Sequence, residues 1–260
     1  MPSTLAIGLE LQPTTTPPSV RVTVTETGTP SVGSVVVQRI DPDGGTRPVR
    51  TPDGGALVVS GGIAGPVTDS ELPYGAPVTY TVAANNNPTA SVTLAADAVW
   101  LTHPGVPFRS MPVLVQDIGD IDRDPERSLL QPIGRARGVA ITAGVRNGES
   151  GQLSVLTQTD VEAAAMRALL DDSSVLLLNQ SPGRALGLRY RWISVGKYTE
   201  KRVNRLATDP LRIFVLPFDD VDRPGGGTRA QITWADIAAK YATWADIPAG
   251  TTWAQLAAGA

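Results

Sequence analysis

The sequence predicts a mainly β protein: two β-sandwich modules, of which the second carries one helix, followed by a short helical tail. Three observations support this fold class. Short runs in which apolar and polar residues alternate recur along the chain, as in strands with one buried face. Glycine and proline supply 26 and 22 of the 260 residues and stand between these runs, where tight turns need them. Only one long segment repeats apolar residues at helical spacing.

The length of the chain predicts its division into modules. At 260 residues it exceeds a typical domain of roughly 100–150 residues. The character of the sequence changes after residue 97, and the triple glycine at 225–227 is typical of a flexible linker. We therefore expect modules at 1–97 and 98–222, a linker at 223–227 and a repeat tail at 228–260.

The first module is expected to form a sandwich of seven strands. The clearest strand is 19–26, where Val20, Val22 and Val24 share one face and polar residues occupy the other. Turns rich in Asp, Asn, Pro and Gly separate the strands, at the spacing expected of a sandwich. The other expected strands are 4–11, 34–40, 47–50, 56–60, 78–84 and 89–94.

One segment of the first module carries a more specific pattern. Residues 72–82 read Leu-Pro-Tyr-Gly-Ala-Pro-Val-Thr-Tyr-Thr-Val, which resembles the turn and strand of immunoglobulin-like and fibronectin III-like sandwiches. The resemblance implies that Leu72 enters the core. It also implies that Tyr80 packs its ring inward and sends its hydroxyl to a backbone partner.

The second module is expected to be a sandwich with an internal hairpin. The expected strands are 113–117, 139–145, 151–157, 175–179 and 211–216. The Asn147-Gly148 pair favours a hairpin in which 151–157 returns along 139–145. We expect the last of these strands, which opens with alternating apolar and polar residues, to end at Pro217.

A further strand of this module should have one apolar and one basic face. Leu188, Tyr190 and Trp192 alternate there with two arginines. The basic side chains of this region are expected to be solvated or to form ion pairs with an acidic neighbour. They are Arg189, Arg191, Lys197, Lys201, Arg202 and Arg205.

The predicted helix covers residues 160–170. Thr159 is a good N-cap, and Glu162 follows at the position that completes a capping box. One face of this helix collects apolar residues, which predicts packing against the sheet. These residues are Val161, Ala165, Ala168 and Leu169.

The tail repeats a short unit of the form Thr-Trp-Ala-Asp/Gln-Ile/Leu. Its tryptophans are ten and nine residues apart, and each unit begins like a miniature helix with a threonine cap. Helices this short are not stable alone, so the tail must dock on a protein surface. The predicted docking residues are Trp234, Ile237, Trp244, Ile247, Trp253 and Leu256. The alternative is that the tryptophans stack on sugar rings of a glycan.

Composition argues against several classes of protein. There are no cysteines, which excludes disulfides, thiolate nucleophiles and cysteine-based metal sites. The net charge of −3 does not suit a nucleic-acid binder, which needs a basic surface. No stretch of about 20 apolar residues occurs, so we expect that the chain does not insert into a membrane. The sequence also shows no secretory signal, so we expect the protein to assemble in the cytoplasm.

The residues that could carry chemistry favour no enzyme. His103 is the single histidine and is expected to be an exposed or capping loop residue. Asp120, Asp122 and Asp124 are spaced like the first ligands of a calcium loop, but Pro125 stands where that loop needs glycine. No nucleophile elbow, phosphate-binding loop or zinc-protease helix occurs. We expect no catalytic, cofactor-binding or metal-binding residues.

Three segments, together with the tail repeats, carry a resemblance to a known family. Residues 35–44, 69–80 and 99–101 resemble minor tail proteins of long-tailed phages of actinobacteria, many of which end in similar Thr-aromatic repeats. The resemblance implies a structural virion component near the distal tail ring, with a distal-tail-like second sandwich. It implies a homo-oligomeric ring that contacts other tail proteins, and no active-site residues.

Two other functions remain as alternatives. The first is a receptor-binding tail protein that recognises host cell-wall glycan through the tail tryptophans. The second is a cell-wall hydrolase, which would need a pair of carboxylates brought together by the fold.

Overall fold

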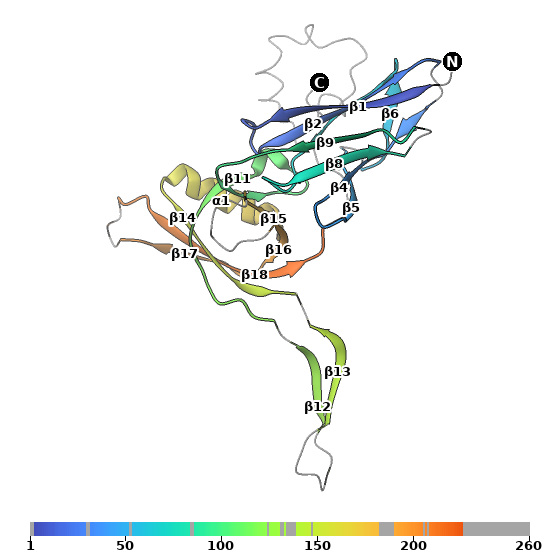
Figure 1. The fold of residues 1–260 in the computed structure, drawn as a ribbon. Helices are drawn as coiled ribbons and strands as arrows, with labels where there is room; N and C mark the ends of the chain where they lie inside the picture. Colours follow the sequence, from blue (N-terminus) through green and yellow to red (C-terminus); the bar gives the residue numbers. More distant parts are fainter. Residues whose placement is uncertain are drawn as a thin grey trace. The chain divides into compact units, whose positions relative to one another are not determined.

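The structure is a computed structural model, shown as a ribbon in Figure 1. It describes residues 3–29, 32–51, 54–83, 86–123, 125–130, 133, 139–146, 148–181, 190–204, 206 and 208–225. The protein is mainly β, with one α-helix and several sheets in this described part, which confirms the predicted class. No helix of this part is long and apolar enough to cross a membrane.

The contacts within the chain divide it into two compact units, each assembled from separate stretches of sequence. Unit 1 combines Met1–Pro112 with Leu177–Tyr190 and with the chain from Pro224 onward. Unit 2 combines Val113–Leu176 with Arg191–Arg223. The two units therefore interleave along the chain, whereas the sequence suggested consecutive modules that meet after residue 97.

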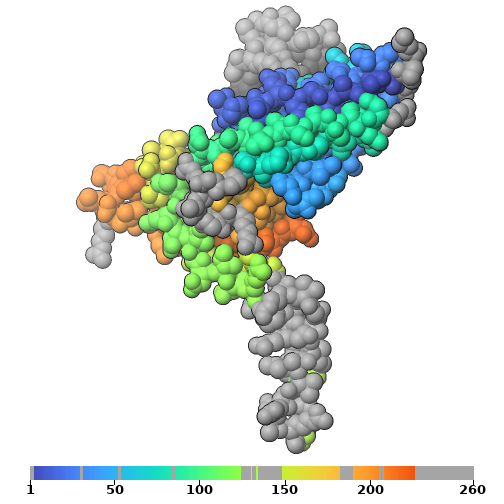
Figure 2. Space-filling model, viewed as in Figure 1, coloured from blue at the N-terminus to red at the C-terminus, as the bar shows by residue number. Residues whose placement is uncertain are grey.

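Unit 1 contains two antiparallel sheets. The five-stranded sheet has the order β1 (Thr4–Gln12), β2 (Ser19–Thr27), β7 (Ile63–Asp69), β6 (Leu57–Ser60) and β3 (Ser34–Val35). The four-stranded sheet has the order β5 (Thr46–Pro48), β4 (Val37–Ile40), β8 (Pro77–Val82) and β9 (Thr89–Thr93). Strands β1 and β9 contact each other and appear as the neighbouring dark blue and green bands of Figure 2.

The core of unit 1 draws on both sheets. Val20, Val22 and Val24 of β2 are at most 1 % exposed, as their alternation predicts. Val78 and Tyr80 of β8 belong to the same buried cluster. One hydrophobic core therefore joins the two sheets, at a gain of roughly 25 cal/mol for each Å² of apolar surface removed from water.

The predicted strand 34–40 is interrupted. Val35 and Val37 are buried, but Val36 between them is 44 % exposed and belongs to neither strand. Val35 pairs with Leu57 in β6, whereas Val37 pairs with Val82 in β8. The chain thus passes from one sheet to the other at Val36, which alternation of residues alone cannot reveal.

Strand β7 was not expected, and its sequence contains Gly65 and Pro66. These residues form a β-bulge: the register with β2 shifts between Val22 and Val24, so that Gly65 and Pro66 together face Thr23. Gly65 has φ +94°, a conformation that favours glycine. The missing N–H of proline is tolerated at such a bulge.

A seven-stranded sheet contains most of the remaining strands. Its order is β14 (Ser150–Thr157), β11 (Met111–Ile118), β10 (Val99–Thr102), β15 (Val175–Asn179), β16 (Arg191–Val195), β18 (Arg212–Val221) and β17 (Thr199–Arg202). An additional pairing of β14 with β18 closes six of these strands into a barrel. A short 3-10 helix, Pro107–Arg109, follows β10.

In unit 2, strand β14 does not form the predicted hairpin. It pairs with β11 on one side and with β18 over its whole length on the other. Strand β13 (Val139–Arg146) pairs instead with β12 (Pro125–Leu130), a strand that the sequence analysis did not identify. The prediction that 151–157 returns along 139–145 is therefore wrong, although both strands exist.

The sequence suggested that strand β18 ends at Pro217, and this prediction is wrong. The strand continues to Val221, and Pro217 lies opposite Gln152 of β14. The carbonyl of Pro217 accepts a hydrogen bond from Gly196 N at 2.9 Å. Phe214 and Leu216, on the inward side of β18, are fully buried.

The predicted helix is confirmed as α1 (Asp160–Asp172). Thr159 Oγ1 accepts a hydrogen bond from Glu162 N at 3.1 Å, as a capping box requires. The Glu162 carboxylate accepts from Gln158 N at 2.8 Å, one residue before the cap. The predicted buried face is largely wrong: only Leu169 of its four residues is buried, together with Ala163 and Met166.

Candidate functional site

The main cluster of chemically active side chains in unit 1 surrounds Arg39. This residue lies on β4 and points into the core with a side chain only 2 % exposed. Its Nη1 donates to both carboxylate oxygens of Asp69, at 2.8 and 3.0 Å. Its Nε and Nη2 donate to the two oxygens of Asp41, at 2.5 and 3.1 Å, and Nη2 also contacts Tyr190 Oη at 3.2 Å. Both carboxylates therefore bind one guanidinium bidentately.

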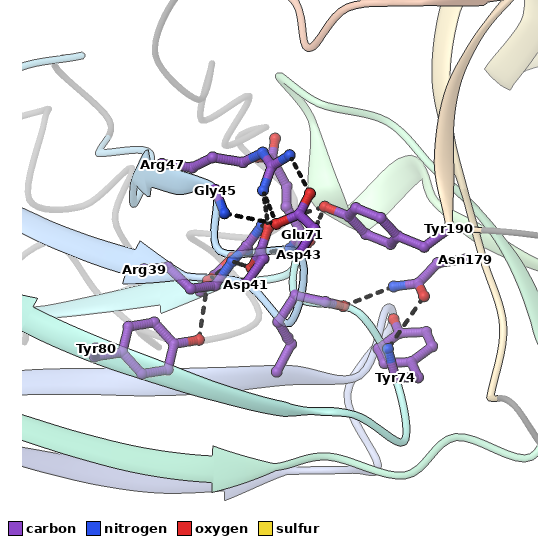
Figure 3. Close-up of polar contacts among 12 residues, drawn as sticks. Arg39, Asp41, Asp43, Gly45, Arg47, Glu71, Tyr74, Tyr80, Asn179 and Tyr190 are labelled. Carbon is purple, nitrogen blue, oxygen red and sulfur yellow. Dashed lines mark hydrogen bonds and ion pairs between the residues drawn. The ribbon is translucent and has the colours of Figure 1, made fainter.

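Two tyrosines complete this arrangement (Figure 3). Tyr80 Oη donates to Asp69 Oδ2 at 2.9 Å, and Tyr190 Oη donates to the carbonyl of Glu71 at 2.7 Å. The ring of Tyr80 is fully buried, as expected. Its hydroxyl, however, binds a carboxylate rather than the predicted backbone partner. Tyr74 makes that kind of contact instead, because its hydroxyl donates to the carbonyl of Pro18 at 3.1 Å.

A second arginine, Arg47, reaches the network from its rim. Its Nη1 binds Asp41 at 2.5 Å and its Nη2 binds Asp43 at 3.0 Å, while its side chain is 28 % exposed. Asp43 also accepts from Gly45 N at 2.8 Å. The hydrogen bond from Arg47, supported by the one from Gly45, lowers the pKa of Asp43 from its ordinary value.

A third arginine, Arg50, extends the network toward the end of the described chain. Its Nε binds Glu71 Oε1 at 2.5 Å, and both side chains are less than 10 % exposed. Arg50 also donates to the carbonyl of Pro224, within the predicted linker 223–227. We define the network by its charged members: Arg39, Arg47, Arg50, Asp41, Asp43, Asp69 and Glu71.

An asparagine ties the segment Leu177–Tyr190 to the rest of unit 1. Asn179 lies on β15 and is fully buried. Its Nδ2 donates to the carbonyl of Leu72 at 2.7 Å, and its Oδ1 accepts from Tyr74 N at 3.2 Å. Leu72 itself is fully buried, which confirms the expectation that it enters the core. Asn179 thus satisfies two backbone groups of the turn that precedes β8.

The electrostatics of the network favour a fixed, closed arrangement. Burial raises the pKa of Tyr74, Tyr80 and Tyr190, and the charge of Asp69 adds to this in each. All three therefore stay protonated and can donate hydrogen bonds at neutral pH. The buried guanidinium and carboxylates satisfy one another, so the network is suited to holding the sheets of unit 1 in one arrangement.

Unit 2 contains a separate cluster around Glu149. Arg191 Nη1 binds its carboxylate at 2.5 Å, and Arg123 donates to the other oxygen. The hydrogen bond from Arg123 and then that from Arg191 lower the pKa of Glu149. Arg191 is only 8 % exposed, so it does not lie on the solvated basic face that the sequence predicted. Its charge is instead paired within the unit.

The other basic residues of that predicted face are either exposed or outside the described residues. Lys201 and Arg202 lie on β17, whose four residues are all exposed, and Lys197 is exposed just before it. Arg189 and Arg205 lie outside the described residues. The strand of this region begins at Arg191, and the predicted alternation of an apolar and a basic face is wrong within it, because Arg191, Trp192 and Ile193 are all buried.

His103 has a capping role in unit 1. It is 7 % exposed, and its Nδ1 accepts hydrogen bonds from Gly105 N at 3.0 Å and Val106 N at 2.9 Å. Of the two expected roles, capping therefore holds and exposure does not. The residue stabilises the turn that leads into the 3-10 helix.

The acidic loop of unit 2 offers no assembled cation site in its described part. Asp122 forms an isolated bridge with Ser150 through backbone hydrogen bonds of 2.8 and 2.9 Å. Asp124 lies outside the described residues. Within the residues that the structure describes, no group of three or more acidic or histidine side chains is placed to hold a metal.

The predicted docking residues of the tail cannot be placed in the fold. Trp234, Ile237, Trp244, Ile247, Trp253 and Leu256 all lie outside the described residues. The docking role of these side chains stays a prediction.

No family model matches the chain, and a search of curated proteins finds no match.

Proposed function

We propose that this protein is a structural component of a phage tail tip, a minor tail or distal tail protein. It oligomerises as a ring and scaffolds neighbouring tail proteins, without an enzymatic role. It assembles in the host cytoplasm and becomes part of the virion, without binding nucleic acid or entering a membrane. Its first sandwich is immunoglobulin-like or fibronectin III-like, and its second is of the distal-tail kind.

The observation that supports this proposal is that charged side chains lie in the interior while large apolar side chains lie on the surface. In unit 1, charged side chains are drawn into a closed network, while Val58 is 72 % exposed and Ile63 is 50 % exposed. In unit 2, Leu114 is 50 % exposed and Val161 is 80 % exposed. We take these exposed apolar side chains as positions that other proteins cover in the assembled tail, where contiguous apolar surface is typical of contacts. Such a distribution supports an assembly protein better than an enzyme.

Incorporation into particles tests this function. The chain is expressed from the phage that encodes it, either complete or without residues 226–260, and purified particles are probed by quantitative mass spectrometry. Ending the truncation at Gly225 keeps the contact between Arg50 and Pro224. We expect the complete chain in the particles and the loss of the truncated one, because the tail repeats supply docking contacts.

The same experiment separates the proposal from its alternatives. A complete chain that never enters particles would refute the structural role. A truncated chain that enters particles normally but no longer supports binding to purified host envelope would favour the glycan-binding alternative. A matched variant with the tail intact and Trp234, Trp244 and Trp253 changed to alanine distinguishes the tryptophans from the rest of the tail.

A further inference from the structure

Strand β1 is an unprotected edge of the five-stranded sheet. It has nine residues, and within the described chain it pairs with β2 alone. The other edge strands of the three larger sheets are β3, β5, β9 and β17, with two, three, five and four residues. Proteins protect sheet edges by shortness, proline or charge: β5 ends in Pro48, and β17 reads Thr-Glu-Lys-Arg. Strand β1 is longer, lacks proline and carries one charge, at Glu10.

The contacts of Leu5 show which backbone groups of β1 face away from β2. The N–H of Leu5 donates to Asn86 Oδ1 at 3.3 Å, and its carbonyl accepts from Asn86 Nδ2 at 2.7 Å. Every second residue of an antiparallel strand directs these groups to the same side, so those of Ile7, Leu9 and Leu11 also face away from β2. Within the described residues no strand pairs with them there. Three successive edge positions are therefore open to another strand.

The side chains at these open positions are apolar. Ile7 and Leu9 are half-buried and pack against the core of unit 1, whereas Leu11 is 47 % exposed. Gly8 and Glu10, which alternate with them, are exposed. A strand added at this edge would form main-chain hydrogen bonds and cover apolar side chains of β1. These are the interactions of β-strand addition.

We propose that β1 of one copy pairs antiparallel with β1 of a second copy, with Leu9 on the two-fold axis. In this register Ile7 lies opposite Leu11 of the second copy, and the three open positions of both strands face one another. Each of the three opposed pairs can exchange two hydrogen bonds. Leu11, which is exposed in the single chain, then packs beside Ile7 of the second copy.

The pattern of β1 favours a second copy as the occupant of this edge. The open stretch is symmetric about Leu9, so two identical strands match in length and in the order of their apolar residues. Glu10 lies opposite Gly8 of the second copy, so like charges do not oppose each other. Arg21 of β2, 3.8 Å from Glu10, offsets the charge of this carboxylate. Because a two-fold contact closes on itself, it joins two copies.

This contact goes beyond the proposed function, because it does not depend on the particle that contains the protein. Proline at Leu11 tests it. The N–H of Leu11 faces away from β2, so Leu11→Pro removes an edge donor and keeps the pairing with β2. Sedimentation equilibrium of the complete chain measures the dissociation constant of the dimer. We expect Leu11→Pro to raise this constant by about tenfold or more, because the proline ring also obstructs the second strand.

The matched control is Leu11→Val, which keeps the backbone N–H. Its dissociation constant should stay within about threefold of that of the original chain. Circular dichroism checks that both variants fold.

Charges at Gly8 test the register. A Cβ at Gly8 would meet Thr23 O at 3.7 Å, an ordinary contact, so a side chain fits there in the single chain. Gly8→Glu places a carboxylate opposite Glu10 of the second copy, twice in each dimer. It should raise the dissociation constant about fivefold at low salt. The double variant Gly8→Glu with Glu10→Lys opposes unlike charges and should restore the association of the original chain.

Three results would overturn this inference. An original chain that stays monomeric up to about 100 μM excludes the contact. A dimer whose dissociation constant is the same in Leu11→Pro and Gly8→Glu forms through another surface. A dimer weakened by Leu11→Pro but not by Gly8→Glu excludes the register centred on Leu9. Each of these results leaves the proposed function standing, because entry into particles tests that function separately.

Discussion

Arg39 is the residue on which the interior charge of unit 1 depends. Its removal would leave Asp41 and Asp69 buried without their main counterion. We expect Arg39→Met to lower the free energy of unfolding by about 3–5 kcal/mol, as measured by urea denaturation. Arg21→Met is the control, because Arg21 is 45 % exposed and lies 3.8 Å from an exposed Glu10. That change should cost less than about 1 kcal/mol, and equal losses in both variants would contradict the account.

The buried tyrosines predict a loss of stability at alkaline pH. In the unfolded chain tyrosine ionises near pH 10, whereas burial raises the pKa of Tyr74 in the fold. The unfolded state therefore binds fewer protons above about pH 10, and the free energy of unfolding falls as pH rises. Tyr74→Phe should make this fall shallower by up to about 1.4 kcal/mol per pH unit. Urea titrations from about pH 8 to about pH 11 measure how the free energy of unfolding depends on pH in both proteins. The same slope in the original protein and in Tyr74→Phe would contradict a raised pKa of the Tyr74 hydroxyl.

Glu149 predicts the opposite dependence at acid pH. Because Arg123 and Arg191 lower its pKa in the fold, it contributes stability above the ordinary pKa of a glutamate. That contribution disappears as pH falls through the lowered value. Glu149→Gln should therefore destabilise the protein at neutral pH and weaken the dependence of stability on pH between about 3 and 7. Urea midpoints across this range test it, and parallel curves for the two proteins would exclude the ion pair as a source of stability.

The signal for the charge network was present in the sequence but incomplete. Arg39 follows Val37 by two residues, so the alternation places both on the inward face of one strand. An arginine at such a position requires buried carboxylates. Its partner Asp69 lies on β7, 30 residues away, and the ion pair forms only because of how the strands fold together. Local pattern thus identifies the charge but not its partner.

At the scale of elements, the N-cap of α1 makes a local prediction. Thr159 Oγ1 accepts the hydrogen bond that would otherwise be missing at Glu162 N. Thr159→Ala should lower the free energy of unfolding by about 1 kcal/mol, and Thr159→Ser should restore most of it. Chemical denaturation of the three proteins measures this. A serine variant as unstable as the alanine one would point to packing of the threonine methyl instead of capping.

Elements whose signals are local were predicted well, and those that depend on distant contacts were not. The start of α1 follows from its cap, and β2 follows from three alternating valines. The buried face of α1 was misjudged because apolar residues surround the helix, and tertiary packing selects among them. The hairpin expected at Asn147-Gly148 did not form, because β14 pairs along its whole length with β18.

At the scale of the whole molecule, unit 1 depends on a segment far along the chain. Asn179 and Tyr190 hydrogen-bond to groups near Leu72, Glu71 and Arg39. A fragment of residues 1–97 lacks this segment and should be cleaved by protease faster than the same region in the complete chain. Equal protection in fragment and complete chain would show that the first module is self-sufficient. The boundary at residue 97 could be proposed from sequence, but the return of the chain to unit 1 could not.

The proposed role in a phage tail tip is tested most directly by locating the protein in the particle. Gold-labelled antibody against unit 1 is applied to phage particles whose genome encodes this chain and viewed by electron microscopy. The account predicts label at the distal end of the tail. Label confined to the capsid, or particles that contain no such protein, would contradict it.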